Sequence, residues 1–581
     1  MTPVAVTTPD VTPVTEYASP GTPPPKSTSP FATAYALVGA LLFGSLAGLE
    51  LLARVVPEAA SLGIFLWFGS YLYVLSFAAY CLTNLVQHAW QHKTPVTLLT
   101  LAIATFVVAW HWRDPRALSG EATQEIACVL SQLTTTADHG YRESCFLGYP
   151  TRQLYLPAVP TLLFGRSMAA LYAGASLYLL LGLVVFTSGI VRYFRYSAIG
   201  GWMNAILVGA IFHFYYFNSL TFQYEQSAFP FGLALLAVGL FFHYRATPKP
   251  YLLVLLGYSG LYLVYAYTPS LALLGLELVT LLYWAARDER SLWGRLPLVG
   301  LVLGLLLFLV TSFSLRGDLR LHDSSGETGK QLMSDLATAF EHLLYQNHGN
   351  PMVSPLFSFV FVALVLACAL GVFGKRAVPV ALWIIATIIA AEVAQGYAYY
   401  GIDYRLERAT VAVPVFLGLL TAVCARWVRR ANAWQLCVAA LIIGSSGLYY
   451  HNLYMRSLFP NPNWAFIQWL ESNVPAQPAS TQPRSLYILY GADQYNNLAS
   501  LYDALQYFMP GVTTTIDPAL DQRIAAAPAK VLSTMSGIFV LAPNGKANVA
   551  SQALAHDPQR YRYDGRFRTD RGAFLLVFNT R

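Results

Sequence analysis

Long apolar segments alternate with short polar connections between residues 31 and 451 of this 581-residue chain. Most of these segments are close to the roughly 20 residues that a helix needs to cross the hydrocarbon core of a membrane. The pattern therefore predicts about thirteen transmembrane helices and a mainly α fold, that of a polytopic membrane protein. The predicted spans are 31–54, 62–87, 94–112, 167–194, 199–217, 226–244, 250–266, 269–286, 294–314, 355–374, 377–397, 408–428 and 433–451.

Basic residues in the connections predict how these spans are oriented. Lys and Arg gather in the short cytoplasmic loops of membrane proteins. Six alternate connections carry them, including the ones with Lys93 and with Arg192 and Arg195. All six lie on the cytoplasmic side if the N-terminus does. The loops 113–166 and 315–354 and the C-terminal part are then expected outside a plasma (inner) membrane.

The composition agrees with a membrane protein. Hydrophobic residues make up 56% of the chain and charged residues 11%, whereas soluble proteins carry roughly 25% charged residues. The net charge of +7 does not indicate nucleic acid, because the basic residues lie mainly in short loops between apolar segments. The expected partner is the lipid bilayer.

The two ends of the chain differ from the predicted transmembrane part, 31–455. Residues 1–30 are rich in Pro, Thr and Ser, which predicts a disordered cytoplasmic tail, and they lack the basic and apolar regions of a signal peptide. From about 465 the composition becomes that of a soluble protein. Strand-like runs SLYILYG, VTTTID and GIFVLAP precede a predicted hairpin of YRYDGRFR and GAFLLVFN. Residues 465–581 are therefore expected to form a small extracytoplasmic α/β domain.

The outer loop 113–166 carries the candidate chemistry. Asp114 and Glu121 follow an apolar span directly, and Glu125 shares a face with Glu121 if this stretch is helical. A carboxylate at the membrane surface can act as a general base or can hold a divalent cation against a diphosphate. The alternative is structural: Asp114 breaks one helix together with Pro115, and Glu121 caps the next.

Cysteines and histidines of the outer loops give weaker signals. Cys128 and Cys145 share one loop and could form a disulfide in an oxidising compartment; two unpaired thiols are the alternative. The histidines of loop 315–354 match no compact ligand spacing, so no metal site is predicted there.

The order of the segments resembles the GT-C superfamily of integral-membrane glycosyltransferases, which includes protein mannosyltransferases and aminoarabinose transferases. Its members place an acidic motif, often Asp-Glu-Ala, in the first long outer loop. A stretch with Pro and Tyr follows, and then a span introduced by Phe-Gly. The matching segments here are GEATQEIACVLSQL, YPTRQLYLPAVPTLLFGR, NAILVGAIFHFYYF and ERATVAVPVFLGLLTA. One departure is Gly120, which stands where the family has its first acidic residue.

The resemblance implies a reaction and roles for particular residues. The donor would be a polyprenyl-phosphate sugar, transferred to an acceptor that the sequence does not identify. Asp114 or Glu121 would act as the base. Residues proposed to bind substrate are Arg405, Arg408, Glu225, Tyr155 and Arg152. Arg405 and Arg408, at the start of the predicted span 408–428, suit a phosphate because guanidinium groups bind it through paired hydrogen bonds. Their alternative role is to anchor the helix at the membrane interface.

Two other function classes are compatible with the sequence. A transporter or flippase of a lipid-linked substrate would use intramembrane acids such as Glu277 and Glu392, because charged groups in a membrane are costly unless they work there. The sequence shows no internal repeat of the kind that many transporters have. The third class is a GT-C-like protein that binds lipid or partners without catalysis, which the Gly120 departure allows.

Overall fold

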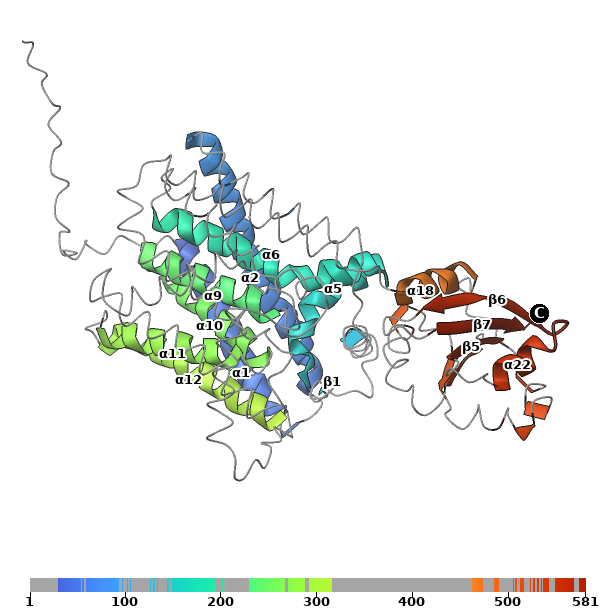
Figure 1. Cartoon of the computed structure of the whole chain (residues 1–581). Coiled ribbons are helices and arrows are strands. Elements are labelled where there is room, and N and C mark those ends of the chain that lie inside the picture. The colour runs from blue at the N-terminus through green and yellow to red at the C-terminus, as the bar shows by residue number, and fades with distance from the viewer. Residues whose placement is uncertain are drawn as a thin grey trace, which may run out of the picture.

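The structure is a computed structural model. It describes residues 30–53, 59–92, 149–194, 229–266, 270–287, 292–315, 462–473, 485–490, 513–516, 537–542, 549–568 and 574–580, together with isolated positions between these ranges. The helices gather in one group, and the C-terminal sheet lies to one side of it (Figure 1).

Seven long helices confirm predicted apolar spans. They are α1 (Pro30–Leu52), α2 (Ala60–His92), α6 (Met168–Tyr193), α9 (Phe229–Ala246), α10 (Pro250–Tyr265), α11 (Ser270–Arg287) and α12 (Leu292–Leu315). Among the described residues, three segments are long and apolar enough to cross a membrane, Pro30–Leu52, Leu62–Trp90 and Ala169–Tyr193. The chain is an integral membrane protein. The other six predicted spans lie wholly or mainly outside the described residues.

Helices α6 and α9 approach each other at glycines. A Cβ atom built on Gly182 would lie 2.2 Å from the carbonyl oxygen of Gly232, and one on Gly189 would lie 2.4 Å from that of Gly239. Each helix thus presents two glycines seven residues apart, and the two pairs face each other. Small residues let membrane helices pack backbone to backbone. We call these four glycines the glycine seam.

A short element, η3 (Thr151–Leu154), lies near the end of the loop 113–166 and leads into α5 (Tyr155–Phe164). Before it, the two-residue strands β1 (Ser144–Cys145) and β2 (Tyr149–Pro150) pair in antiparallel fashion. Gly165 ends α5 with φ of 82°, a backbone conformation that glycine adopts without a steric penalty. Ser167 then caps α6 by accepting a hydrogen bond from the backbone N–H of Ala170.

The C-terminal sheet has five strands in the order β4-β3-β5-β7-β6. They are β3 (Ser485–Tyr490), β4 (Thr513–Ile516), β5 (Gly537–Ala542), β6 (Tyr561–Arg568) and β7 (Phe574–Thr580). β3, β4 and β5 are parallel, and β7 pairs antiparallel with both β5 and β6. The predicted strands and the terminal hairpin are confirmed.

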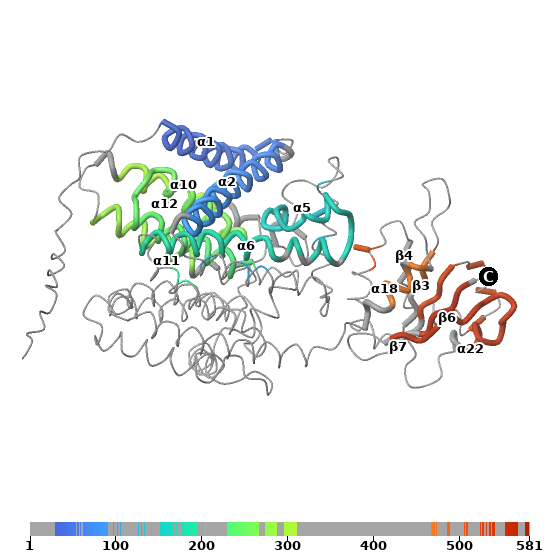
Figure 2. The backbone as a smooth tube through the Cα atoms, turned by 90° about the horizontal axis from the view of Figure 1, so that it is seen from above, coloured from blue at the N-terminus to red at the C-terminus, as the bar shows by residue number. Residues whose placement is uncertain are grey.

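Two helices accompany this sheet, α18 (Pro462–Asn473) and α22 (Val549–Ala555). Phe466 and Trp469 of α18 pack their rings against Phe567 of β6. In two perpendicular views, α5 lies on the side of the membrane helices that is nearest the sheet (Figure 1 and Figure 2).

Candidate functional site

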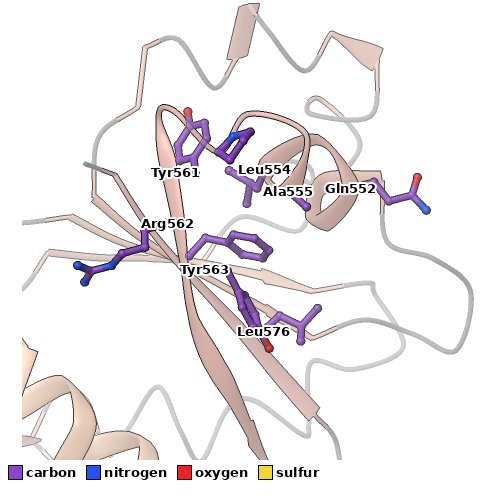
Figure 3. Close-up of a pocket in the computed structure, with 9 residues that line it drawn as sticks. Gln552, Leu554, Ala555, Tyr561, Arg562, Tyr563 and Leu576 are labelled. Carbon is purple, nitrogen blue, oxygen red and sulfur yellow. The ribbon is translucent and has the colours of Figure 1, made fainter.

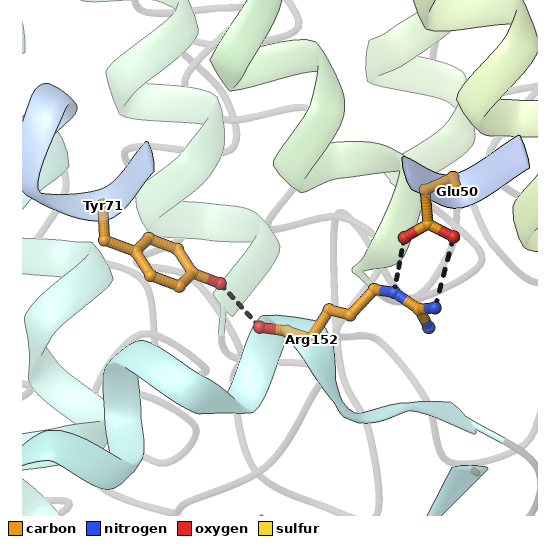
Figure 4. Close-up of polar contacts among 3 residues, drawn as sticks. All are labelled: Glu50, Tyr71 and Arg152. Atoms are coloured by element: carbon orange, nitrogen blue, oxygen red, sulfur yellow. Dashed lines mark hydrogen bonds and ion pairs between the residues drawn. The ribbon is translucent and has the colours of Figure 1, made fainter. Parts of the chain in front are cut away.

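The element η3 is fixed in the protein interior by a buried ion pair. Arg152 is 1% exposed, and its Nε and Nη2 donate to Glu50 Oε1 and Oε2 at 2.9 and 3.3 Å. Glu50 lies in the last turn of α1, 102 positions earlier in the chain (Figure 4). Paired hydrogen bonds between guanidinium and carboxylate fix direction as well as distance. The pair therefore ties the end of the acidic loop to the end of the first span.

Tyrosine hydroxyls from two more helices hold the backbone of the same element. Tyr71 of α2 donates to the carbonyl oxygen of Arg152 at 2.6 Å (Figure 4). Tyr178 of α6 donates to the carbonyl oxygen of Gln153 at 2.9 Å. The guanidinium of Arg152 also lies 5.1 Å from the ring centroid of Tyr265 in α10. Four helices thus converge on η3.

Of the predicted substrate-binding residues, Arg152 and Tyr155 are described, and both are buried. Tyr155 is 0% exposed, and its ring stacks on Phe68 at a centroid distance of 6.1 Å. Neighbouring Gln153 is 2% exposed, and neither side-chain amide atom has a hydrogen-bond partner within the described part of the chain. An amide both donates and accepts, so it can pair with a hydroxyl group.

The remaining predicted residues lie outside the described residues. They are Asp114, Glu121, Glu225, Arg405 and Arg408. Cys128 is also outside, so the disulfide with Cys145 stays a prediction, as do the roles of the two carboxylates. Among the residues that the structure describes, no group of three or more His, Cys, Asp or Glu could hold a metal ion.

Sequence reasoning missed Glu50. Its signal was present in the segment GLELLARVV, because an acid within an apolar span is costly unless it has a partner. The sequence does not say which of the many arginines supplies that partner. The contact joins residues 102 positions apart, and only the fold brings them together.

A second contact joins the start of α6 to the C-terminal part of the chain. The hydroxyl of Tyr507 lies 3.1 Å from that of Thr161 and donates to the carbonyl oxygen of Ser167 at 3.3 Å. Arg166 Nη1 donates to the carbonyl oxygen of Tyr507 at 3.1 Å. We call these four residues the Tyr507 junction.

Burial changes both titratable groups of the Tyr507 junction. It raises the pKa of Tyr507 and lowers the pKa of Arg166, in each case because desolvation penalises the charged form. A neutral Tyr507 hydroxyl keeps the proton that it donates to Ser167. The junction is therefore built for a protonated tyrosine.

The solved structures to which this chain is similar include two of ArnT from Cupriavidus metallidurans. ArnT from Cupriavidus metallidurans bound to undecaprenyl phosphate is 15% identical, with a TM-score of 0.48, over 83% of this chain and 97% of that chain. The same protein in the apo state is 15% identical, with a TM-score of 0.46, over 84% and 98%. No protein-family model and no curated protein matches this chain.

ArnT is a GT-C aminoarabinose transferase, so these structures belong to the superfamily that the sequence resembles.

Proposed function

We propose that this protein is a membrane glycosyltransferase that moves a sugar from a polyprenyl-phosphate donor to an acceptor on the outer face of the membrane. The observation that supports this most directly is the structure of residues 149–193. The stretch with Pro and Tyr folds as η3 and α5, and Phe164 and Gly165 lie two residues before the long helix α6. This is the order of elements that the resemblance implies after the acidic loop.

The anchoring of η3 supports a catalytic role for that loop. General acid–base catalysis needs a base held within hydrogen-bond reach of the proton that it removes. Glu50, Tyr71 and Tyr178 fix one end of the loop to three spans. A loop with a fixed end positions its carboxylates more reproducibly than a free one.

The proposed roles follow from the chemistry of each group. Asp114 or Glu121 takes the proton from the acceptor hydroxyl or amine, whose oxygen or nitrogen then bonds to the anomeric carbon. The bond between that carbon and the donor phosphate breaks with inversion. Arg405 and Arg408 bind the departing phosphate. Glu225 lies at the outer end of a predicted span, from which it reaches the same substrate.

Arg152 and Tyr155 are buried at η3 and at the start of α5, where they set the position of the loop. A divalent cation is not required by these roles. It would bind between the loop carboxylates and the donor phosphate if one took part.

The test is sugar transfer from a polyprenyl-phosphate sugar by purified protein carrying Asp114→Asn or Glu121→Gln. We expect kcat to fall by about 10²–10⁴-fold in the variant that lacks the base, in line with the usual contribution of general-base catalysis. Glu125→Gln is the matched control and should keep most of the activity. Full activity in both test variants would rule out the base assignment, and no transfer by the wild type would leave a non-catalytic lipid-binding protein.

One observation favours the transporter alternative. Glu277 of α11 is 1% exposed and accepts a hydrogen bond from Ser259 of α10 at 2.7 Å, while its Oε2 has no partner within the described residues. A working acid in a transport path would have such a place. Lipid translocation in proteoliposomes that stops in Glu277→Gln, with sugar transfer absent from the wild type, would support the transporter.

A further inference from the structure

A depression lies at the edge of the C-terminal sheet, where α22 and the turn after it meet β6 (Figure 3). Its volume is about 660 Å³, which is within the roughly 300–1,000 Å³ of small-molecule sites. The lining comes from α22, from the edge strand β6 and from β7 beside it. None of these residues has a role in the proposed transfer reaction.

The floor of the depression is rigid and apolar. Leu554, Tyr561 and Phe578 are 0%, 3% and 4% exposed and belong to the small core that packs α22 on the sheet. The ring of Tyr561 packs edge-on against Phe539 at a centroid distance of 5.7 Å. A binding surface on such a floor keeps its shape without a ligand.

An aromatic ring stands at the mouth. Tyr563 is 53% exposed, yet its ring packs on Phe578 at a centroid distance of 5.3 Å. Contact with Phe578 limits the ring's orientation, and the rest of the ring faces solvent. An aromatic side chain has an apolar body and, in tyrosine, a polar tip. It offers a flat apolar surface with a hydroxyl at its end.

Two planar polar side chains lie at the border of the depression. Gln552 and Arg562 are both exposed, the first on α22 and the second on β6. Arg562 Nε donates to Asp564 on the same strand, which restrains the guanidinium. In Figure 3 the Arg562 side chain points to the other side of β6 from Tyr561, and the Gln552 side chain points away from Tyr563. The ring of Tyr563 and its hydroxyl are therefore the groups that the depression offers to the apolar C–H face and the hydroxyls of a ligand.

Pairing with a peptide strand is the other use of a sheet edge, and β6 is protected against it. A bulge interrupts its pairing with β7 between Tyr563 and Gly565, and Arg562 and Arg566 are exposed along the strand. Bulges and charged side chains are the usual devices that keep an edge strand from recruiting another strand. The depression therefore favours a compact ligand.

We propose that this depression binds a sugar unit of a glycan, with Tyr563 as the stacking surface. Its use in holding the acceptor near the transfer site rests on the proposed function; the binding of sugar does not. The probe is a printed array of mono- to trisaccharides, read with fluorescently labelled full-length protein in detergent and with no lipid-linked donor present.

We expect the wild type to bind at least one glycan on the array. Tyr563→Ala and Ala555→Trp should each weaken that binding at least tenfold, the first by removing the stacking ring and the second by filling the mouth from an exposed position. Tyr563→Trp should keep it. His556→Ala and Arg566→Ala are matched controls: His556 is exposed in the turn after α22, Arg566 is exposed on β6, and neither lines the depression, so both variants should bind like the wild type.

Two results would overturn the inference: no glycan bound by the wild type, or equal binding by wild type, Tyr563→Ala and Ala555→Trp. Weaker binding in Arg566→Ala alone would also overturn it, because the strand edge would then be the contact. Glycan binding without any sugar transfer would contradict the proposed function and leave this inference standing. Sugar transfer by the wild type, together with unchanged glycan binding in Tyr563→Ala, would support the proposed function and overturn this inference.

Discussion

At the scale of single residues, the ion pair of Glu50 and Arg152 fixes the end of the loop 113–166 against the helix α1. Both side chains are almost fully buried, at 3% and 1% exposed. Removing two charges from water is costly, and the pair offsets that cost only while both partners and their geometry are kept. We infer that the pair fixes the position of η3 more than it adds to the stability of the folded protein.

The first prediction separates these two roles. Glu50→Gln leaves the guanidinium of Arg152 buried without its counter-charge and should destabilise the protein by about 3–5 kcal/mol. The double variant Glu50→Leu, Arg152→Met removes both charges and should recover most of that loss. Thermal unfolding in detergent measures both. Arg245→Met is the control, because Arg245 is exposed and its contact with Trp284 is worth about 1 kcal/mol.

Sugar transfer by the double variant then tests whether the ion pair positions the loop 113–166. If η3 positions the loop, the double variant should be stable and should still lose activity. A stable double variant with full activity would show that the pair has no part in positioning the loop.

At the scale of elements, the structure contains two kinds of contact between segments. The glycine seam joins α6 and α9 along their backbones, while the Tyr507 junction joins the α5–α6 turn to the C-terminal part through a few hydrogen bonds. Backbone contact tolerates no added atom. Hydrogen bonds at a junction can break and form again.

The second prediction concerns the glycine seam. Gly182→Ala and Gly232→Ala place a methyl group within 2.2–2.4 Å of backbone atoms of the other helix and should each cost several kcal/mol, of the size seen for overpacked cores. Gly275→Ala and Gly300→Ala are matched controls, since nothing lies within 4 Å of a Cβ at either position. These controls should be neutral or should gain up to about 1 kcal/mol from helix propensity. Equal melting temperatures in all four would contradict the packing.

The third prediction concerns the Tyr507 junction. Tyr507→Phe removes the hydroxyl and keeps the ring, and the loss of its hydrogen bonds should cost about 1–2 kcal/mol locally. Backbone amides of residues 161–170 should then exchange hydrogen roughly 5- to 30-fold faster. Tyr563→Phe, which changes an exposed hydroxyl on β6, should leave that exchange unchanged. Unchanged exchange in Tyr507→Phe would mean that the junction does not restrain the turn.

The fourth prediction follows from the raised pKa of Tyr507. The folded state holds the tyrosine proton more tightly than the unfolded state, whose pKa is near the ordinary 10.0. The stability from the neutral hydroxyl is therefore complete below pH 10 and decreases as the pH rises above it. Amide exchange at residues 161–170 should accelerate above pH 10 beyond its intrinsic increase, and this extra acceleration should be absent in Tyr507→Phe.

The sequence predicted elements better than contacts, for a physical reason. An apolar run of about 20 residues has one stable form in a bilayer, so α1, α2 and α6 could be placed from hydropathy alone. The strand run SLYILY and the terminal hairpin were equally local signals. The pairing of Glu50 with Arg152, and of Thr161 with Tyr507, depends on which elements become neighbours. No local pattern in the sequence carries that information.

At the scale of the whole molecule, the orientation in the membrane sets what the candidate sites can meet. The outer location of the acidic loop and of the C-terminal sheet is a prediction from basic loops. It is central to the proposed function, because a lipid-linked donor and an acceptor must reach the loop from the same side. The depression beside Tyr563 can serve the reaction only if it shares that side.

The fifth prediction tests this orientation. In a variant whose six cysteines are replaced by Ser, a single cysteine at Thr580 should react with a membrane-impermeant thiol reagent in intact spheroplasts. A cysteine at Lys93 should react only after the membrane is permeabilised. The opposite pattern would place the acidic loop in the cytoplasm and would exclude transfer on the outer face.

The glycine seam also limits where a lipid chain can pass between the helices. A methylene group needs about 3.5–4.0 Å to each carbon neighbour, yet even one Cβ on Gly182 would lie 2.2 Å from the facing backbone. No prenyl chain can pass between α6 and α9 while they are packed in this way. A lipid chain that enters the group of helices therefore has to pass between other helices.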